Sequence, residues 1–163
     1  MIEQIKHLQN NRPLDDIVGF DVPRCVTYEQ RWIRHGDWYP DRLVRLFRKG
    51  HAQFEGGRVH ERLVLAGTLR SFQGELQHYS FKDSNDHWLR CQHYAKLWAQ
   101  TKHESGKRVG RTAPVFHTVF RWFRGYILKR GFLDGRQGWR IAKMCTREVY
   151  LKYKLLYKIN YPQ

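Results

Sequence analysis

The sequence has no long apolar run, few cysteines and, in its second half, few acidic side chains. Nothing in its 163 residues approaches the run of roughly 20 apolar residues that spans a bilayer. The opening residues are amphipathic and lack the apolar core and cleavage site of a signal peptide. The three cysteines, Cys25, Cys91 and Cys145, are odd in number and far apart, which disfavours a disulfide framework and favours a reducing compartment. We therefore expect a cytoplasmic chain, soluble or peripheral to a membrane.

Several motifs that indicate a particular chemistry are also missing. The chain contains no Gly-x-Gly-x-x-Gly nucleotide loop, no Gly-Lys-Ser/Thr phosphate loop and no Cys-x-x-Cys pair. His60-Glu61 lacks the second histidine of a zinc-binding His-Glu-x-x-His helix. His87 and Cys91 stand one helical turn apart with His93 close by, but this spacing is more typical of a half-buried helix face than of a zinc site.

Positive charge is abundant and unevenly distributed. Residues 1–80 carry 12 basic and 10 acidic side chains, a net charge of +2, whereas residues 81–163 carry 18 and 5, a net charge of +13. Such a field attracts nucleic acid, an anionic membrane surface or phosphorylated substrates. Within residues 116–124, arginines alternate with phenylalanine and tryptophan, a pattern that a simple solvated basic face explains poorly.

Hydrophobic periodicity predicts short strands before residue 80 and helices after it, and therefore a mixed α and β chain. The first half has the pattern of a helix at 2–10 and of strands at 17–26 (broken by Pro23), 42–48, 59–65 and 69–79. The second half has the pattern of helices at 84–104, 114–130 and 137–157, with a flexible basic linker at 105–112. We accordingly expect a strand-rich region over residues 1–80 and a basic helical extension over residues 81–163.

The predicted helix at 114–130 carries a bulky apolar stripe along one face. Its members recur at helical spacing: Val115, Phe116, Val119, Phe120, Phe123, Tyr126 and Ile127. The stripe either packs on the strand-rich region or inserts into an anionic membrane, since residues 107–158 hold 14 basic and only 2 acidic side chains. The pattern alone does not separate these alternatives.

Three constellations in the first half could carry chemistry. Trp38 precedes a strand with Arg42 and Arg45, whose guanidinium groups suit phosphate oxygens, although a solvated edge strand has the same pattern. Gly56-Gly57 forms a turn before His60-Glu61, where a carboxylate could take a proton from a hydroxyl nucleophile or simply lie at the surface. His78, at a strand end, suits either a metal ligand or a packed imidazole.

In combination these segments resemble a known family. WYPDRLVRLFRKGHAQFEGGRVHERL, then LQHYS, then YILKRGFLDGRQGW are similar to the C-terminal half of family-2 glycosyltransferases, and more narrowly to the bacterial lipopolysaccharide core β-1,4-glucosyltransferases. The resemblance covers residues 3–158 and implies that residues 1–80 are the acceptor-side part of a catalytic domain, followed by the basic helical extension. It implies a GT-A fold, a Rossmann-like α/β domain that binds a nucleotide-sugar and inverts the anomeric centre in one displacement.

The resemblance also implies roles for individual residues. Glu61 falls at the catalytic base, which deprotonates the acceptor hydroxyl, and His78 falls at a late histidine that helps to hold a divalent metal, Mg²⁺ or Mn²⁺, on the donor diphosphate. Gly56 and Gly57 match the glycine turn before the base. The implied substrate-binding residues are Trp38, Asp41, Arg42, Arg45, Gly56, Gly57 and His60.

One feature of the family is absent from this sequence. Family members bind the nucleotide through an N-terminal half with an Asp-x-Asp dyad, and this sequence contains no Asp-x-Asp. The expectation is therefore a truncated chain, inactive alone, derived from an enzyme that transfers glucose from UDP-glucose to an inner-core heptose. It would act on the cytoplasmic face of the inner membrane, with the lipopolysaccharide core and anionic lipid as partners and no nucleic acid. The alternative is a basic nucleic-acid-binding module, which the charge of the second half favours.

Overall fold

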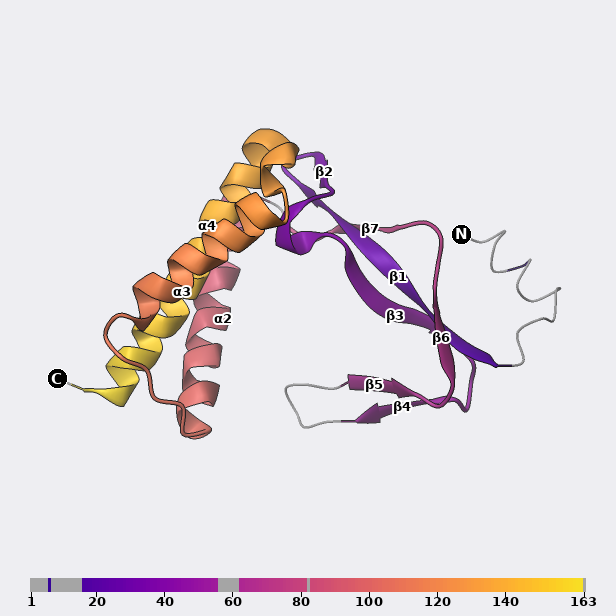
Figure 1. Cartoon of the computed structure of the whole chain (residues 1–163), viewed down its shortest axis with the longest axis horizontal. Helices are drawn as coiled ribbons and strands as arrows, with labels where there is room; N and C mark the ends of the chain where they lie inside the picture. The colour runs from indigo at the N-terminus through magenta and orange to yellow at the C-terminus, as the bar shows by residue number, and fades with distance from the viewer. Residues whose placement is uncertain (1–5, 7–15, 56–61, 82, 163) are drawn as a thin grey trace. The chain divides into compact units, whose positions relative to one another are not determined.

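The computed structural model describes residue 6 and residues 16–55, 62–81 and 83–162 (Figure 1). About 51% helix and 26% strand confirm the mixed α and β class. The strands are β1 (Ile17–Tyr28), β2 (Arg31–Ile33), β3 (Asp41–Phe47), β4 (Ala52–Glu55), β5 (Arg62–Leu65), β6 (Thr68–Ser71) and β7 (Leu76–Tyr79). The helices are η1 (Gly36–Trp38), α2 (Ser84–Glu104), α3 (Ala113–Trp122), η2 (Phe123–Leu128), η3 (Gly131–Asp134) and α4 (Gly135–Asn160). The predicted helix at 2–10 lies outside the described residues, apart from Lys6.

The long strand β1 organises the main sheet. It pairs antiparallel with β2 and β3 and parallel with β6, and β7 also pairs with it, while β4 and β5 form a separate antiparallel pair. The predicted break at Pro23 is wrong, because Pro23 lies inside β1 in register with Arg42 of β3. A proline fits a strand wherever no ladder bond needs its N–H. The single strand predicted at 69–79 is also wrong: β6 and β7 are separate, and Gly74 between them has a φ of 117°.

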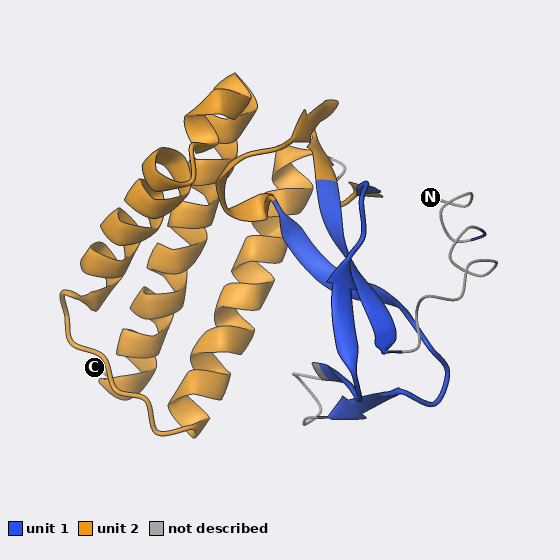
Figure 2. Ribbon diagram, turned by 45° about the vertical axis from the view of Figure 1, so that its right-hand side comes forward, with its two compact units in different colours: residues 1–25, 40–77 blue, residues 26–39, 78–163 orange. Residues whose placement is uncertain are grey.

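The chain forms two compact units, coloured separately in Figure 2. Unit 1 comprises residues 1–25 and 40–77, and unit 2 comprises residues 26–39 and 78–163. In unit 1, Ile17, Val18 and Val22 of β1 are buried, and Phe20 meets the buried Phe72 edge to face. Unit 1 is therefore a small β structure whose buried apolar side chains come largely from β1.

Unit 2 contains the three long helices, α2, α3 and α4. Asp83 caps α2 by accepting hydrogen bonds from the backbone N–H groups at positions 85 and 86, so the helix begins as predicted. Both α2 and α3 pack along α4 (Figure 1). The segment predicted as a flexible linker joins this core, because Val109 is buried with Ala99 and Leu156. A second cluster contains Tyr28, Ile33, Ile141 and Cys145.

Helix α3 is oriented with its apolar side toward solvent. Its Pro114, His117 and Thr118 are buried or half-buried, and the His117 ring stacks on Tyr153 of α4 at 3.9 Å between centroids. In contrast, large apolar residues of α3 and of the π-helical η2 that continues it are exposed: Val115, Phe116, Val119, Phe120, Trp122, Phe123, Ile127 and Leu128. This orientation is the reverse of the usual arrangement of an amphipathic helix on a core. Within the described residues, no helix is both long enough and apolar enough to cross a membrane.

Candidate functional site

Four of the predicted site residues cannot be placed. Gly56, Gly57, His60 and Glu61 lie outside the described residues. The base predicted at Glu61 and the glycine turn before it therefore stay predictions.

The predicted substrate-binding residues of β3 form ion pairs with β1 in unit 1. Asp41 pairs with Arg24, and Arg42 Nη1 lies 2.7 Å from Asp21 Oδ1. Arg45 is exposed on the same strand. The structure thus brings Asp41 and Arg42 together on one ladder, where each already has a partner of opposite charge.

His78 has a local partner as well. Its Nδ1 is hydrogen-bonded to Ser80 Oγ, and the residue is half-buried. Among the described residues, no group of three or more His, Cys, Asp or Glu side chains is placed to hold a metal. A single imidazole fits Mg²⁺ or Mn²⁺ poorly, since these ions prefer oxygen ligands. The described residues alone therefore do not make the metal site that the resemblance implies, and no chemical step is assigned to a metal.

Trp38 belongs to an aromatic cluster in unit 2. Its ring stacks on Phe81 with centroids 5.3 Å apart and meets Tyr28 edge to face. His87 lies among these rings, 4.4 Å from Phe81, and its Nδ1 is 3.2 Å from the Tyr28 hydroxyl oxygen. Burial lowers the pKa of His87 to about 4. His87 is thus a packed, hydrogen-bonded imidazole, and both His87 and Cys91 are buried more deeply than the half-buried helix face predicted for them.

The loop before Trp38 is held by a buried carboxylate from the end of η3. Asp134 accepts hydrogen bonds from the backbone N–H of His35 at 2.8 Å and of Arg34 at 3.1 Å. Its other oxygen lies 3.0 Å from His35 Nδ1. The N–H of Gly36 donates to the Lys129 carbonyl oxygen at 2.8 Å. Residues distant in sequence therefore fix the conformation of loop 34–38.

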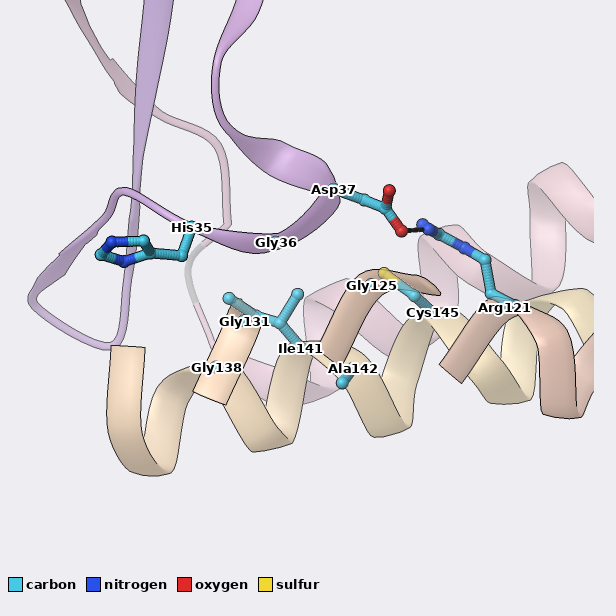
Figure 3. Close-up of a pocket in the computed structure, with 10 residues that line it drawn as sticks. All are labelled: His35, Gly36, Asp37, Arg121, Gly125, Gly131, Gly138, Ile141, Ala142 and Cys145. Carbon is cyan, nitrogen blue, oxygen red and sulfur yellow. Dashed lines mark ion pairs between the residues drawn. The ribbon is translucent and has the colours of Figure 1, made fainter. Parts of the chain in front are cut away.

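Asp37, in the same loop, is surrounded by cations. Its carboxylate is paired with Arg121, with Arg124 at 2.9 Å and with Lys129 at 3.0 Å, and Figure 3 shows Asp37 and Arg121 facing each other. Three cations around one buried carboxylate leave a local excess of positive charge. Burial, together with the neighbouring Arg124 and Arg121, lowers the pKa of Lys129. Such a cluster has the chemistry to attract an anionic group at the surface, for example a phosphate.

Glycines allow these elements to approach one another. A Cβ on Gly125 would lie 2.7 Å from Asp37 Oδ2, and one on Gly131 would lie 2.7 Å from the Gly125 carbonyl oxygen. A Cβ on Gly138 would overlap the Gly131 carbonyl oxygen. The small pocket in Figure 3 is lined by these glycines, by loop 35–37 and by Ile141 and Cys145 of α4.

Asp37 and Asp134 are structural centres that the sequence interpretation missed. Asp134 lies between the helices predicted at 114–130 and 137–157, and the sequence pattern predicts no role for it. The available signal was charge: Asp134 is one of only 2 acidic residues in the basic segment 107–158. An isolated acid in such a segment is a candidate for internal ion pairing or hydrogen bonding.

Comparison with known proteins adds no family assignment. No protein-family model matches the chain, and no solved structure matches it.

Proposed function

We propose that the chain is the acceptor-side part of an inverting family-2 glycosyltransferase of GT-A fold, which transfers glucose from UDP-glucose to a heptose of the lipopolysaccharide inner core. The order of three motifs, at residues 38–63, 76–80 and 126–139, carries this proposal. The contacts in unit 2 add support: Asp134 and Lys129 of the last motif hold loop 34–38, which leads into the first motif. The last motif thus contacts the loop directly before the first motif, although the two segments are far apart in sequence.

The proposed reaction needs one base from this chain. Glu61 accepts the proton of the acceptor hydroxyl, while that oxygen forms a bond to the anomeric carbon. The bond from the anomeric carbon to the diphosphate oxygen breaks on the opposite face, and UDP leaves with the electron pair. Attack opposite to the leaving group inverts the anomeric centre.

The test is made at the chain's own locus, so that any other part of the enzyme stays present. Glu61→Gln should lose turnover by orders of magnitude, because an amide cannot accept the proton. Mass spectrometry of the lipopolysaccharide core should then show the loss of one hexose. Glu55→Gln, an exposed position on β4, is the control and should leave the core unchanged. An unchanged core in the Glu61→Gln strain would contradict the proposal.

We further propose that unit 2 binds the anionic surface of the inner membrane, on its cytoplasmic face. The supporting observation is the solvent-facing apolar side of α3, on which Phe116 is 70% and Val119 61% exposed. Contiguous apolar surface of this kind is typical of a binding site for a membrane or a protein. Side chains such as these gain free energy when they enter the boundary between headgroups and acyl chains.

The charge around this apolar side favours anionic lipid over an apolar protein partner. Four basic residues are exposed just before α3, on η2 and in the turn after η2: Arg111, Arg124, Lys129 and Arg130. Each basic residue near an anionic leaflet contributes about 1 kcal/mol of attraction. Arg124 and Lys129, two of the cations that surround Asp37, therefore have a second role in this proposal, as contacts for lipid phosphates.

Vesicle co-sedimentation tests this attachment. The chain should sediment with vesicles that contain phosphatidylglycerol but not with pure phosphatidylcholine vesicles, and salt should release it. Phe116→Glu should weaken the binding by about tenfold or more, because it places a charge in the inserted face. Leu89→Glu is the matched control: Leu89 is 57% exposed on α2, so the charge changes equally on another helix.

Two results would contradict the membrane proposal. Equal binding to both kinds of vesicle, or to neither, would remove the electrostatic argument. Steep, salt-dependent binding to nucleic acid without binding to anionic vesicles would instead favour a nucleic-acid-binding module.

A further inference from the structure

A groove in unit 2 is separate from the Asp37 cluster and has a different chemistry. It has a volume of about 590 Å³, within the range of small-molecule sites. One wall comes from the β1–β2 hairpin through Thr27, Glu29, Gln30 and Trp32. The other comes from the end of β7 and the start of α2, through Tyr79, Phe81 and Asp83.

Aromatic rings form the apolar part of this groove. The rings of Trp32 and Tyr79 meet at 66° with centroids 5.5 Å apart. Tyr79 is 77% exposed, whereas Trp32 is half-buried and Phe81 stacks on Trp38 in the aromatic cluster described above. A tyrosine left this exposed beside a tryptophan presents a flat apolar surface with a polar edge, which suits a ligand that is apolar on one face and hydroxylated at its rim.

The hairpin turn beside the rings adopts an unfavourable backbone conformation. Glu29 and Gln30, the two residues between the paired Tyr28 and Arg31, have φ of 49° and 66°. Turns with two positive φ values normally use glycine or asparagine, and each non-glycine residue here costs roughly 1 kcal/mol. Backbone strain that is retained in this way is concentrated at functional sites.

Specific bonds hold the strained turn in place. Ser84 Oγ donates to Glu29 Oε1 at 2.6 Å, and Arg140 of α4 pairs with the other oxygen. These contacts lower the pKa of Glu29, so its carboxylate stays ionised near neutral pH. Gln30 is thereby presented at the mouth of the groove as an exposed amide.

The polar groups of the groove select for a neutral, hydroxyl-rich ligand. The described lining residues supply two carboxylates, an amide and two hydroxyl groups, and no lysine or arginine. Asp83 uses Oδ1 for both bonds that cap α2. Because Glu29 is already paired with Arg140, the carboxylate of Asp83 and the amide of Gln30 are the main acceptors for sugar hydroxyls, and a phosphate or diphosphate would meet the like charge of Asp83. This makes the groove unusual on a chain with a net charge of +15.

We propose that the groove formed by Trp32, Tyr79, Gln30 and Asp83 binds the neutral acceptor sugar, with its ring against the aromatic pair and its hydroxyls toward the acids and the amide. This inference rests on the proposed function, because it assigns to the groove the heptose acceptor rather than the nucleotide donor. The donor carries a diphosphate, for which the described lining has no counter-charge.

The experiment is a direct titration of the full chain with a methyl heptoside, followed by NMR of the tryptophan indole N–H groups. The Trp32 indole signal, assigned from Trp32→Phe, should shift with a millimolar dissociation constant. Tyr79→Ala should weaken binding about tenfold, equivalent to about 1.4 kcal/mol. Tyr94→Ala is the matched control, since Tyr94 is a tyrosine 57% exposed on α2, and it should leave binding unchanged. UDP-glucose and inorganic phosphate should not shift the signal.

Each other outcome overturns the proposal. These are no shift with the heptoside, equal binding by wild type and Tyr79→Ala, or a shift of the Trp32 signal by inorganic phosphate. The titration needs no glucose transfer, so its failure would leave the test of Glu61→Gln by lipopolysaccharide analysis unaffected. Conversely, if the chain binds the heptoside but the Glu61→Gln strain keeps a normal core, only the proposed function is contradicted.

Discussion

Acid should destabilise unit 2 through His87, and the structure sets the size of the effect. The residue is 3% exposed among Tyr28, Trp38 and Phe81, and burial lowers its pKa from 6.5 to about 4. The charges that act on it are Glu148 and Asp86, which raise the pKa, and Arg90, which lowers it. Burial outweighs them, so the folded state holds the imidazole neutral.

The sign follows from proton linkage. Below pH 6.5 the His87 imidazole is protonated in the unfolded chain but stays neutral in the folded chain. The contribution of His87 to the free energy of unfolding is therefore fully present above pH 6.5 and is lost as the pH falls toward 4. The difference between the pKa of His87 in the unfolded and in the folded chain corresponds to about 3 kcal/mol in the free energy of unfolding. Between about pH 7 and pH 4.5, roughly 2 kcal/mol of this should be lost through His87 alone.

Urea unfolding at these two pH values measures the effect. Wild type should lose roughly 2 kcal/mol more than His87→Phe, which has no titrating group at this position. The control is His93→Phe, since His93 is exposed on the same helix, and it should keep the wild-type pH dependence. If wild type and His87→Phe lose the same stability on acidification, the assignment of a buried neutral imidazole is wrong.

Two further predictions concern close packing in unit 2. Gly138→Ala should lower the free energy of unfolding by about 3 kcal/mol or more in thermal or urea unfolding, because its Cβ would overlap the Gly131 carbonyl oxygen. Gly110→Ala, where a Cβ meets no atom within 4 Å, is the control, and equal losses would contradict the packing argument. The thiols of Cys91 and Cys145 should react with a disulfide reagent at pH 8 only when the chain unfolds, because burial raises the pKa of Cys91 to about 12 and that of Cys145 as well. Rapid reaction of either thiol in the folded chain would contradict this.

Much of the helical unit could be predicted from the sequence. The helix predicted at 84–104 agrees with α2 at Ser84–Glu104, and the start predicted at 114 lies within one residue of the start of α3 at Ala113. The helix predicted at 137–157 agrees with α4 at Gly135–Asn160, on which Ile141, Cys145 and Leu156 are buried. These features depend on local periodicity and on capping residues, which a single sequence contains.

The orientation of α3 could not be predicted in this way. Periodicity identifies an apolar face, but it does not say whether that face meets protein or another apolar phase. The buried or half-buried side of α3 contains Pro114, His117 and Thr118, a set with no hydrophobic pattern of its own. Stacking of His117 on Tyr153 depends on a residue 36 positions away, by the difference of the two residue numbers.

The contacts that fix loop 34–38 were hidden for a similar reason. Asp134 and the backbone N–H of His35 are 99 residues apart, and nothing in the local pattern of either pairs them. The groove likewise joins Trp32 to Tyr79. Pairings at this separation depend on the folded arrangement of strands and helices, for which a strand of only three residues such as β2 gives little sequence signal.

The solvent-exposed apolar side of α3 affects the solubility of the protein. Molecules in solution can self-associate through these exposed apolar side chains, because association removes apolar surface from water. The solubility of the monomer therefore depends on Phe116, Phe120 and their neighbours. The net charge of +15 opposes this association and weakens as salt is added. Added salt should therefore lower the solubility of this protein. In a cell, the concentration of soluble monomer is limited by how much membrane or other apolar surface is present to cover the exposed side of α3.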